Sequence, residues 1–265
     1  MGRSSYPWGT VRGEAPRREV LLDFLLLAAA EDGPRPFPEP VVEALRRVVP
    51  SETVAYREWG RDGILDRAFA PGDLPTSWSE AWLEYPRLRR DDPHPSELMG
   101  ATPERVGKPL VLGDAVGGRW FRTSGLYFEL MRPFGIRNVL KLFLPRQRAG
   151  GVESVFVFDS SARAFANDER MLLARLVPAL VALRQNARLR AAARSAERRL
   201  QLLTPRELTV LGRVSDGETN AQIAAALFIG TPTVRKHLEH VYDKLGVGNR
   251  AAAAAVYTAG SGGSA

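Results

Sequence analysis

Two hydrophobic periods alternate along the first two thirds of the chain. A period of two residues runs through 53–59 and 64–70, which a turn-like GRDG connects, and again through 138–144 and 152–158, which a loop with Pro and Gly connects. Alternation of this kind predicts two antiparallel hairpins. Helical periods surround them at 17–31, 40–49, 78–85, about 119–132 and from about Asn167 onward. The pattern therefore predicts an α+β domain, an antiparallel sheet with flanking helices that cover one face.

After Leu203 only the helical period remains, and the first helix has a complete start signal. Thr204 stands at the N-cap, Pro205 at the first helical position, and Glu207 three residues after the cap completes a capping box. The predicted buried stripe of this helix is Leu208, Leu211 and Val214. The segment SDGET, 215–219, is expected to end it.

Three more short helices follow. Thr219 is the expected N-cap of the second, with Ile223, Ala224 and Leu227 facing inward. Thr231 is the expected cap of the third and Gly246 its stop, while Asn249 caps a fourth that ends near Tyr257. Four short helices in about 55 residues, with a tight turn between the second and third, predict an all-α helix-turn-helix domain.

The buried stripe of the third helix accounts for only half of its surface. Val234, Leu238, Val241 and Leu245 recur at spacings of four, three and four residues. At roughly 100° per residue, the remaining arc carries another set of side chains. This arc consists of Arg235, Lys236, Glu239, His240 and Asp243. A polar arc on the second helix of a helix-turn-helix is where base edges and phosphates are contacted.

The segments LTPREL, GETNAQIA and TVRKHLEHVYDKLGVGNR carry a resemblance to a known family. Residues 202 to about 258 resemble the DNA-binding domain of LuxR/GerE-type bacterial transcriptional regulators, the group with NarL- and FixJ-like response regulators. The resemblance implies that the third helix lies in the major groove, with Arg235, Lys236 and Glu239 toward bases or nearby phosphates. It implies backbone contacts for Thr233, Asn220 and Arg250, and His240 belongs to the same DNA-facing surface.

Two departures from the family pattern stand out. Phe228 occupies a turn position that is often Gly, and Glu239 stands where several members carry Lys. The second departure affects which DNA sequence is preferred rather than whether DNA is bound.

Upstream, WFRTSGLYFELMRPFGI (120–136) and ARAFANDERMLLARLVPAL (162–180) are similar to GAF-like sensory domains that precede this type of helix-turn-helix. A receiver domain is disfavoured: Asp159 ends a strand as a phosphoacceptor would, yet it comes late in the chain and lacks the acidic pair expected at the early position of a receiver domain. One alternative is an acyl-homoserine-lactone receptor, because SWSEAWLEYPRLRRDDP (77–93) resembles the lactone pocket of quorum-sensing members.

Composition argues against catalysis. The absence of Cys excludes disulfides, thiolate zinc sites and Cys nucleophiles, and the three histidines are His94, His237 and His240. The glycine-rich 113–118 and Gly107 are predicted turns, because no Lys-Ser or Lys-Thr follows as in a phosphate loop. We expect no enzyme activity, no metal and no cofactor.

The positive charge is concentrated in one segment. Residues 1–183 hold 25 Lys and Arg against 24 Asp and Glu, residues 184–200 hold 6 against 1, and residues 201–265 hold 6 against 5. The alanine- and arginine-rich 184–200 predicts a helical linker that contacts phosphates or a second copy, with a solvated face as the alternative. The expected organisation is a disordered tail (1–15), the GAF-like sensory domain (16–183), the basic helical linker (184–200), the DNA-binding domain (201–259) and a flexible tail (260–265).

Aromatic residues crowd the middle of the sensory domain. Trp59, Trp82, Trp120 and Tyr127 are predicted to line a pocket for a small apolar ligand, with ordinary core packing as the alternative. The apolar stretch 20–30 is too short to span a membrane and carries Asp23, so it is predicted to be a core helix.

These observations predict a cytoplasmic, nucleoid-associated homodimer that regulates transcription. Its C-terminal domain would bind double-stranded promoter DNA under control of a domain that senses a small molecule or a protein. RNA polymerase is a further candidate partner, and no membrane is expected. Two other readings are a sigma-factor-like promoter-recognition protein, which the predicted hairpins disfavour, and an enzyme tethered to DNA, which lacks catalytic residues.

Overall fold

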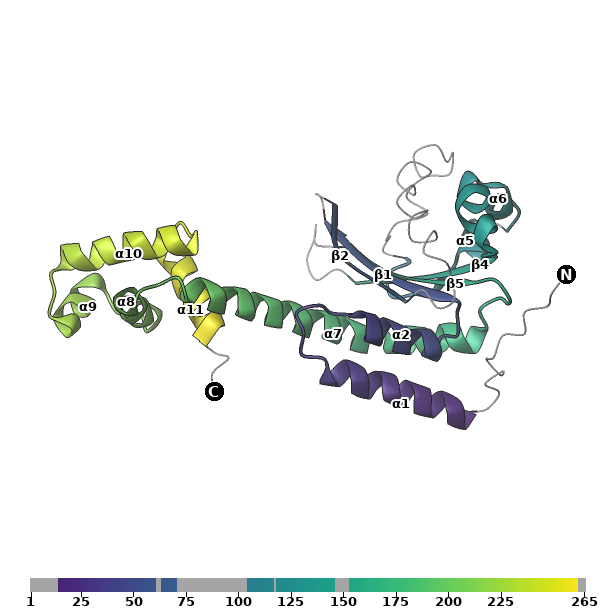
Figure 1. Cartoon of the computed structure of the whole chain (residues 1–265), viewed down its shortest axis with the longest axis horizontal. Coiled ribbons are helices and arrows are strands. Elements are labelled where there is room, and N and C mark those ends of the chain that lie inside the picture. Colours follow the sequence, from purple (N-terminus) through teal and green to yellow (C-terminus); the bar gives the residue numbers. More distant parts are fainter. Residues whose placement is uncertain (1–13, 61–62, 71–103, 117, 146–152, 262–265) are drawn as a thin grey trace. The chain divides into compact units, whose positions relative to one another are not determined.

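The computed structural model describes residues 14–60, 63–70, 104–116, 118–145 and 153–261 (Figure 1). The chain divides between Gln185 and Asn186 into two compact units. The predicted helix at 78–85, Trp82 and the segment 77–93 lie outside the described residues. Of the described helices, none is both long enough and apolar enough to cross a membrane.

The described strands of the first unit form one five-stranded antiparallel sheet in the order β2-β1-β5-β4-β3. Its strands are β1 (Thr53–Gly60), β2 (Gly63–Ala70), β3 (Leu110–Val111), β4 (Asn138–Leu144) and β5 (Glu153–Ser160). Both predicted hairpins are confirmed. They join through the pairing of β1 with β5, in which Val54 lies opposite Phe158.

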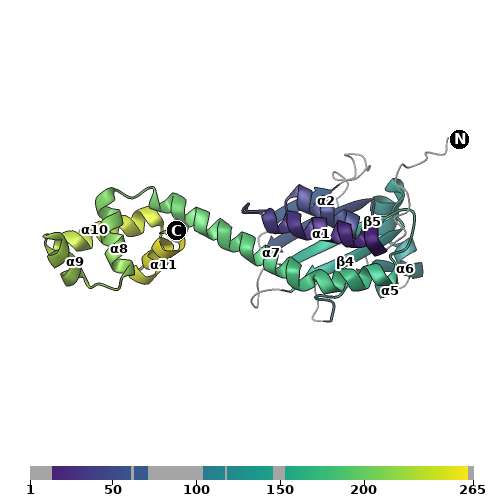
Figure 2. The same cartoon turned by 90° about the horizontal axis from the view of Figure 1, so that it is seen from below.

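Helix α2 (Glu39–Val48) and the first part of α7 (Asn167–Leu200) lie on one face of this sheet (Figure 2), and α1 (Glu14–Ala30) packs against α2 on the same side, farther from the strands (Figure 1). Their apolar side chains share a core with the strands, to which Phe24, Leu45 and Leu180 contribute from the helices. Within it the rings of Phe37 and Tyr56 meet edge to face, with centroids 4.6 Å apart. The predicted α+β architecture is therefore confirmed.

A series of hydrogen bonds between buried polar side chains crosses this core. Arg184 of α7 is fully buried, and its Nη1 donates to Ser154 Oγ at 2.8 Å. Ser154 Oγ donates to Glu58 Oε1 at 3.2 Å, and the Tyr56 hydroxyl donates to the same oxygen at 3.1 Å. Burial, and then the charge of Glu58, raise the pKa of Tyr56 far above its usual value. Arg184, which opens the basic 184–200 segment in sequence, is therefore a structural residue of the sheet domain.

The predicted helix at about 119–132 is wrong in detail. The structure divides it into α6 (Gly118–Thr123), a π-helical turn η2 (Leu126–Met131) and a 3₁₀ turn η3 (Arg132–Phe134). Gly125 weakens the helix between the first two pieces, and Pro133 cannot continue a regular helix at the third. The predicted turn at 113–118 is also wrong, because Leu112–Val116 form the short helix α5, whereas Gly107 does lie in a turn with φ of 75°.

The prediction of a core helix at 20–30 is wrong for most of its leucines. Phe24 and Ala28 of α1 are buried, but the exposed fractions of Leu22 and Leu26 are 56% and 60%. Leu25 also lies on the exposed side. Only one stripe of a helix can face a single neighbouring layer, so a helix that is apolar on several sides leaves leucines at the surface.

The second unit comprises the end of α7 and the described helices α8 (Pro205–Ser215), α9 (Asn220–Leu227), α10 (Thr231–Leu245) and α11 (Arg250–Ser261). The predicted capping box of Thr204 with Glu207 is present, and the predicted cap Thr219 forms a second capping box with Gln222. Asn249 Oδ1 accepts from the Ala252 N–H at 2.8 Å, as a cap of α11. The four-helix arrangement is confirmed.

Three details of these helices differ from the predictions. The N-cap of α10 is Gly230 rather than Thr231, because the Gly230 carbonyl already accepts from the Val234 N–H. Val210 is buried in α8 in place of Leu208, whose exposed fraction is 38%. α11 continues beyond Tyr257 to Ser261.

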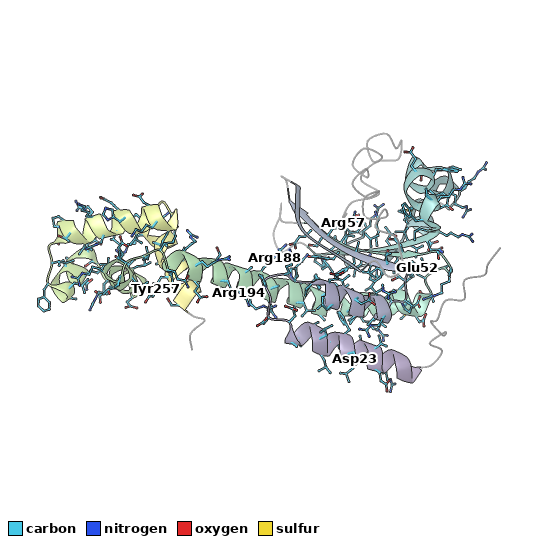
Figure 3. The ribbon with its side chains drawn as sticks, viewed as in Figure 1. Asp23, Glu52, Arg57, Arg188, Arg194 and Tyr257 are labelled. Carbon is cyan, nitrogen blue, oxygen red and sulfur yellow. The ribbon has the colours of Figure 1, made fainter. Side chains whose placement is uncertain are left out.

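Glycines allow two close approaches in this unit. A Cβ at Gly212 of α8 would lie 3.0 Å from Tyr257 Oη, so α11 packs directly against α8 at this point (Figure 3). A Cβ at Gly260 would lie 2.9 Å from the backbone nitrogen of Glu197 in α7. Gly260 is therefore packed against α7, although its sequence context predicted a flexible tail.

Candidate DNA-binding surface

α10 has one buried face and one exposed face, as its spacing predicts. Val234, Leu238, Val241 and Leu245 are buried in the core of the second unit. Arg235, Lys236, Glu239, His240 and Asp243 are all exposed. Arg235 and Lys236 lie nearest the N-terminal end, where the helix dipole also favours an anion. Thr233 is exposed in the first turn of the same helix.

Glu207 ties the end of α10 to the start of α8. Its Oε2 accepts from Lys244 Nζ at 2.7 Å and from the Thr204 N–H at 2.8 Å. Burial alone would raise the pKa of Glu207, but the bonds from Lys244 and Thr204 outweigh burial and lower it to about 2. The carboxylate is therefore ionised at neutral pH and holds α10 in a fixed orientation. The sequence indicated only its capping role, because Lys244 lies 37 residues away.

His240 lies beside the same carboxylate. Its Nδ1 is 3.9 Å from Glu207 Oε1, and about half of its side chain is exposed. The predicted DNA-facing residue therefore stands at the border between the exposed arc and the anchor of α10.

The structure brings Asn220 and Arg250 together. Arg250 Nη1 donates to Asn220 Oδ1 at 3.1 Å, and its Nη2 donates to the Glu218 carbonyl. Both side chains are half-buried. The pair joins the start of α11 to the start of α9, so the two residues predicted to contact the DNA backbone form one preorganised unit.

The end of α7 has both structural and exposed arginines. Arg199 Nη2 donates to the carbonyl of Leu245, the last residue of α10. Arg194 and Arg198 are exposed on the same helix, and Figure 3 labels Arg188 and Arg194 there. Of the three arginines at 194–199, Arg199 therefore has a structural role, because it donates a hydrogen bond to the C-terminal carbonyl of α10.

The predicted ligand pocket falls largely outside what the structure describes. The backbone of Trp59 lies in β1 and that of Trp120 in α6, but their side chains are not among the described ones, and neither is any part of Trp82. Tyr127 lies in η2, half-buried, with its ring 5.9 Å from that of Phe128. The pocket remains a prediction.

Asp159 is a buried acid near the end of β5, the middle strand of the sheet. Its Oδ2 accepts from Thr53 Oγ1 at 2.8 Å, in the register that pairs these two residues across β1 and β5. Burial raises the pKa of Asp159 to about 6, although the bond from Thr53 and the charges of Arg57 and Lys141 act in the opposite direction. The antiparallel sheet around it differs from the parallel sheet of a receiver domain.

The family profile described as bacterial regulatory proteins of the luxR family matches residues 201–257. Residues 201–257 are a luxR-family domain. This segment contains the whole of α8, α9 and α10, and its match fits the two capping boxes and the two-faced third helix described above. The resemblance inferred from the sequence motifs is thus confirmed for this domain.

Named relatives match over the same short region. A probable transcriptional regulatory protein SgaR from Hyphomicrobium methylovorum is 50% identical over 58 residues, 22% of this chain and 28% of SgaR. A probable transcriptional regulatory protein NarL from Mycobacterium tuberculosis is 44% identical over 54 residues, 20% of this chain and 25% of NarL. The match thus spans only about a quarter of the length of these curated relatives.

Solved structures show a weaker similarity over more of the chain. Escherichia coli SdiA covers 92% of this chain and 96% of its own, with 19% identity and a TM-score of 0.41. The N-acylhomoserine-lactone-dependent LuxR-family factor CepR2 from Burkholderia cenocepacia covers 66% of this chain and 93% of its own, with 17% identity and a TM-score of 0.40.

Proposed function

We propose that the protein is a cytoplasmic, homodimeric transcriptional regulator that binds promoter DNA through α10. The observation that carries this proposal is the exposed arc of α10, on a helix that Glu207 holds in place within a luxR-family domain. A helix-turn-helix uses such a face in the major groove, where phosphate contacts set the register and base contacts select the sequence.

The residues of the arc have separate roles in this proposal. Arg235 and Lys236 contact phosphates or the acceptors of guanine, as their charge and position near the helix N-terminus favour. Glu239, one turn further on, repels phosphate and accepts a hydrogen bond from cytosine N4 or orients Arg235. Thr233 and the Asn220–Arg250 unit contact the DNA backbone, with His240 at the edge of the surface.

The first unit serves as the sensory domain in this proposal. A GAF-like α+β domain with helices on one face of its sheet suits the binding of a small apolar ligand, and the aromatic residues at 59, 82, 120 and 127 supply its lining. The ligand changes DNA binding or polymerase contact without covalent chemistry.

A homodimer matches the two half-sites that helix-turn-helix regulators bind. The exposed Leu22, Leu25 and Leu26 of α1 supply an apolar stripe for a second copy of this chain.

The proposal is tested by recovering the genomic fragments that the purified full-length chain binds, and then measuring affinity for one of them. Arg235→Ala should weaken binding by about 1 to 3 kcal/mol. Arg47→Ala, which changes an exposed arginine in α2, is the matched control and should leave affinity unchanged. Recovery of no specific fragment, or equal affinities for the two variants, contradicts the proposal.

A further inference from the structure

The turn between α9 and α10 contains a residue with two unfavourable features. Phe228 has φ of 54° and ψ of 44°, in the left-handed region. Among the described residues it is the one non-glycine with a positive φ, while the others in this region are glycines. Its exposed fraction is 95%, larger than that of any other large apolar residue in the described part of the chain.

Neither feature stabilises the free domain. A Cβ in the left-handed region is disfavoured by local sterics, which is why glycine is the usual residue there. The turn itself is held by backbone bonds, from the Ile229 N–H to the Ala224 carbonyl at 3.0 Å, and by the packing of Ile229 on the core. The exposed ring of Phe228 takes no part in either.

The position of the turn suggests what the ring contacts. Phe228 lies two residues before Gly230, the N-cap of α10, so it stands next to the helix end from which Arg235 and Lys236 extend. Arg206 Nη2 also donates to the Leu227 carbonyl at 3.0 Å, which places an exposed guanidinium at the same turn. An exposed apolar ring on a surface that also carries these cations matches the alternation of deoxyribose and phosphate along a DNA strand.

We propose that Phe228 is a DNA-contacting residue, an inference that rests on the proposed function. Its ring packs against deoxyribose at the edge of the groove that α10 enters. Arg206 pairs with a neighbouring phosphate. Cations beside an apolar ring favour a polyanion over an apolar pocket on a protein partner. The contact adds affinity without base selection, since sugars carry no sequence information.

The test compares Phe228→Gly and Phe228→Asn in the full-length chain. Both residues adopt the left-handed conformation readily, so each variant should fold with unchanged or higher thermal stability. Each should bind the recovered DNA about 3- to 10-fold more weakly, as expected when the apolar area of one ring is no longer buried. Leu202→Ala, which removes another exposed apolar side chain of the same unit, is the control and should bind like the parent.

Salt dependence separates the ring from the cation. Because phenylalanine is uncharged, Phe228→Gly should leave the slope of log affinity against log salt unchanged. Arg206→Gln should lower its magnitude by about one. Unchanged affinity in both Phe228 variants overturns the inference, and so does a loss in the glycine variant alone, which would indicate backbone flexibility.

Two further outcomes separate the possible failures. If the Phe228 variants bind DNA with the affinity of the parent but no longer activate transcription in a reconstituted reaction, the ring contacts the polymerase. That result would overturn the proposed DNA contact. If Arg235→Ala weakens binding and the Phe228 variants do not, only this inference fails. If the parent chain binds no specific DNA, the proposed function itself fails.

Discussion

Replacing Glu207 by Gln removes one charge from the anchor of α10 and keeps the shape of the side chain. The amide oxygen of Gln can still accept from the Thr204 N–H, so the capping interaction survives, while the ionic bond to Lys244 at 2.7 Å is lost. Hydrogen bonds to charged groups contribute about 1.5 to 3 kcal/mol. The lowering of the pKa from 4.5 to about 2 sets a limit near 3 kcal/mol. We expect the variant to be less stable by about 2 kcal/mol at pH 7.

The effect should depend on pH with a defined sign. The pKa of Glu207 is lower in the folded state than in the unfolded chain, so its contribution is fully present above pH 4.5 and is lost as the pH falls toward 2. The difference between parent and variant should therefore shrink across this range. Since all five tryptophans precede residue 121, amide hydrogen exchange of 205–215 and 231–245 is the suitable local measurement.

Glu218→Gln is the matched control. Glu218 pairs with Arg213 at 2.8 Å, but about a third of each side chain is exposed, and such pairs contribute about 1 kcal/mol or less. Equal losses of protection in the two variants, or a difference between parent and Glu207→Gln that stays constant from pH 7 to pH 2, would refute the assignment of Glu207 as the anchor.

Three other changes have expected outcomes. Asp159→Asn should stabilise the first unit by about 1 to 3 kcal/mol above pH 6, because the raised pKa of Asp159 means that its charged form is unfavourable in the folded state. The gain in melting temperature should vanish below pH 4, and a gain that is constant with pH would contradict this expectation. Leu26→Glu should shift sedimentation toward the monomer, while the exposed-leucine control Leu202→Glu should not. Arg194→Gln with Arg198→Gln should lower the salt slope by about two if both contact phosphates, and an unchanged slope supports a solvated face.

The local features of the second unit could be predicted because their causes lie within a few residues of sequence. Each capping box joins residues three apart, and the buried stripe of α10 needs only the helical period. The start of α10 was misplaced by one residue, since Gly230 provides its carbonyl to the helix without a side-chain signal.

Features that depend on distant partners could not be predicted in the same way. The sequence presents Arg184 as one of six linker cations, but Ser154, on a strand far away in sequence, accepts a hydrogen bond from it and links it to Glu58. The bridge from Lys244 to Glu207 and the exposure of Leu22 and Leu26 likewise depend on which helix faces pack together. Periodicity shows which positions of a helix are apolar. When a helix is apolar on several sides, periodicity does not show which of these sides packs against the rest of the protein and which stays exposed.

In the proposed function the exposed arc of α10 reads DNA sequence, and Glu239→Ala tests this role most directly. Its affinity should be measured for the recovered operator and for every single-base substitution of one half-site, beside Asp243→Ala, one turn further along the same arc. We expect Glu239→Ala to lose the preference at one base pair, worth about 1 to 3 kcal/mol, and to keep the others. A uniform change on every sequence, or a preference identical to that of the parent chain, would contradict the claim.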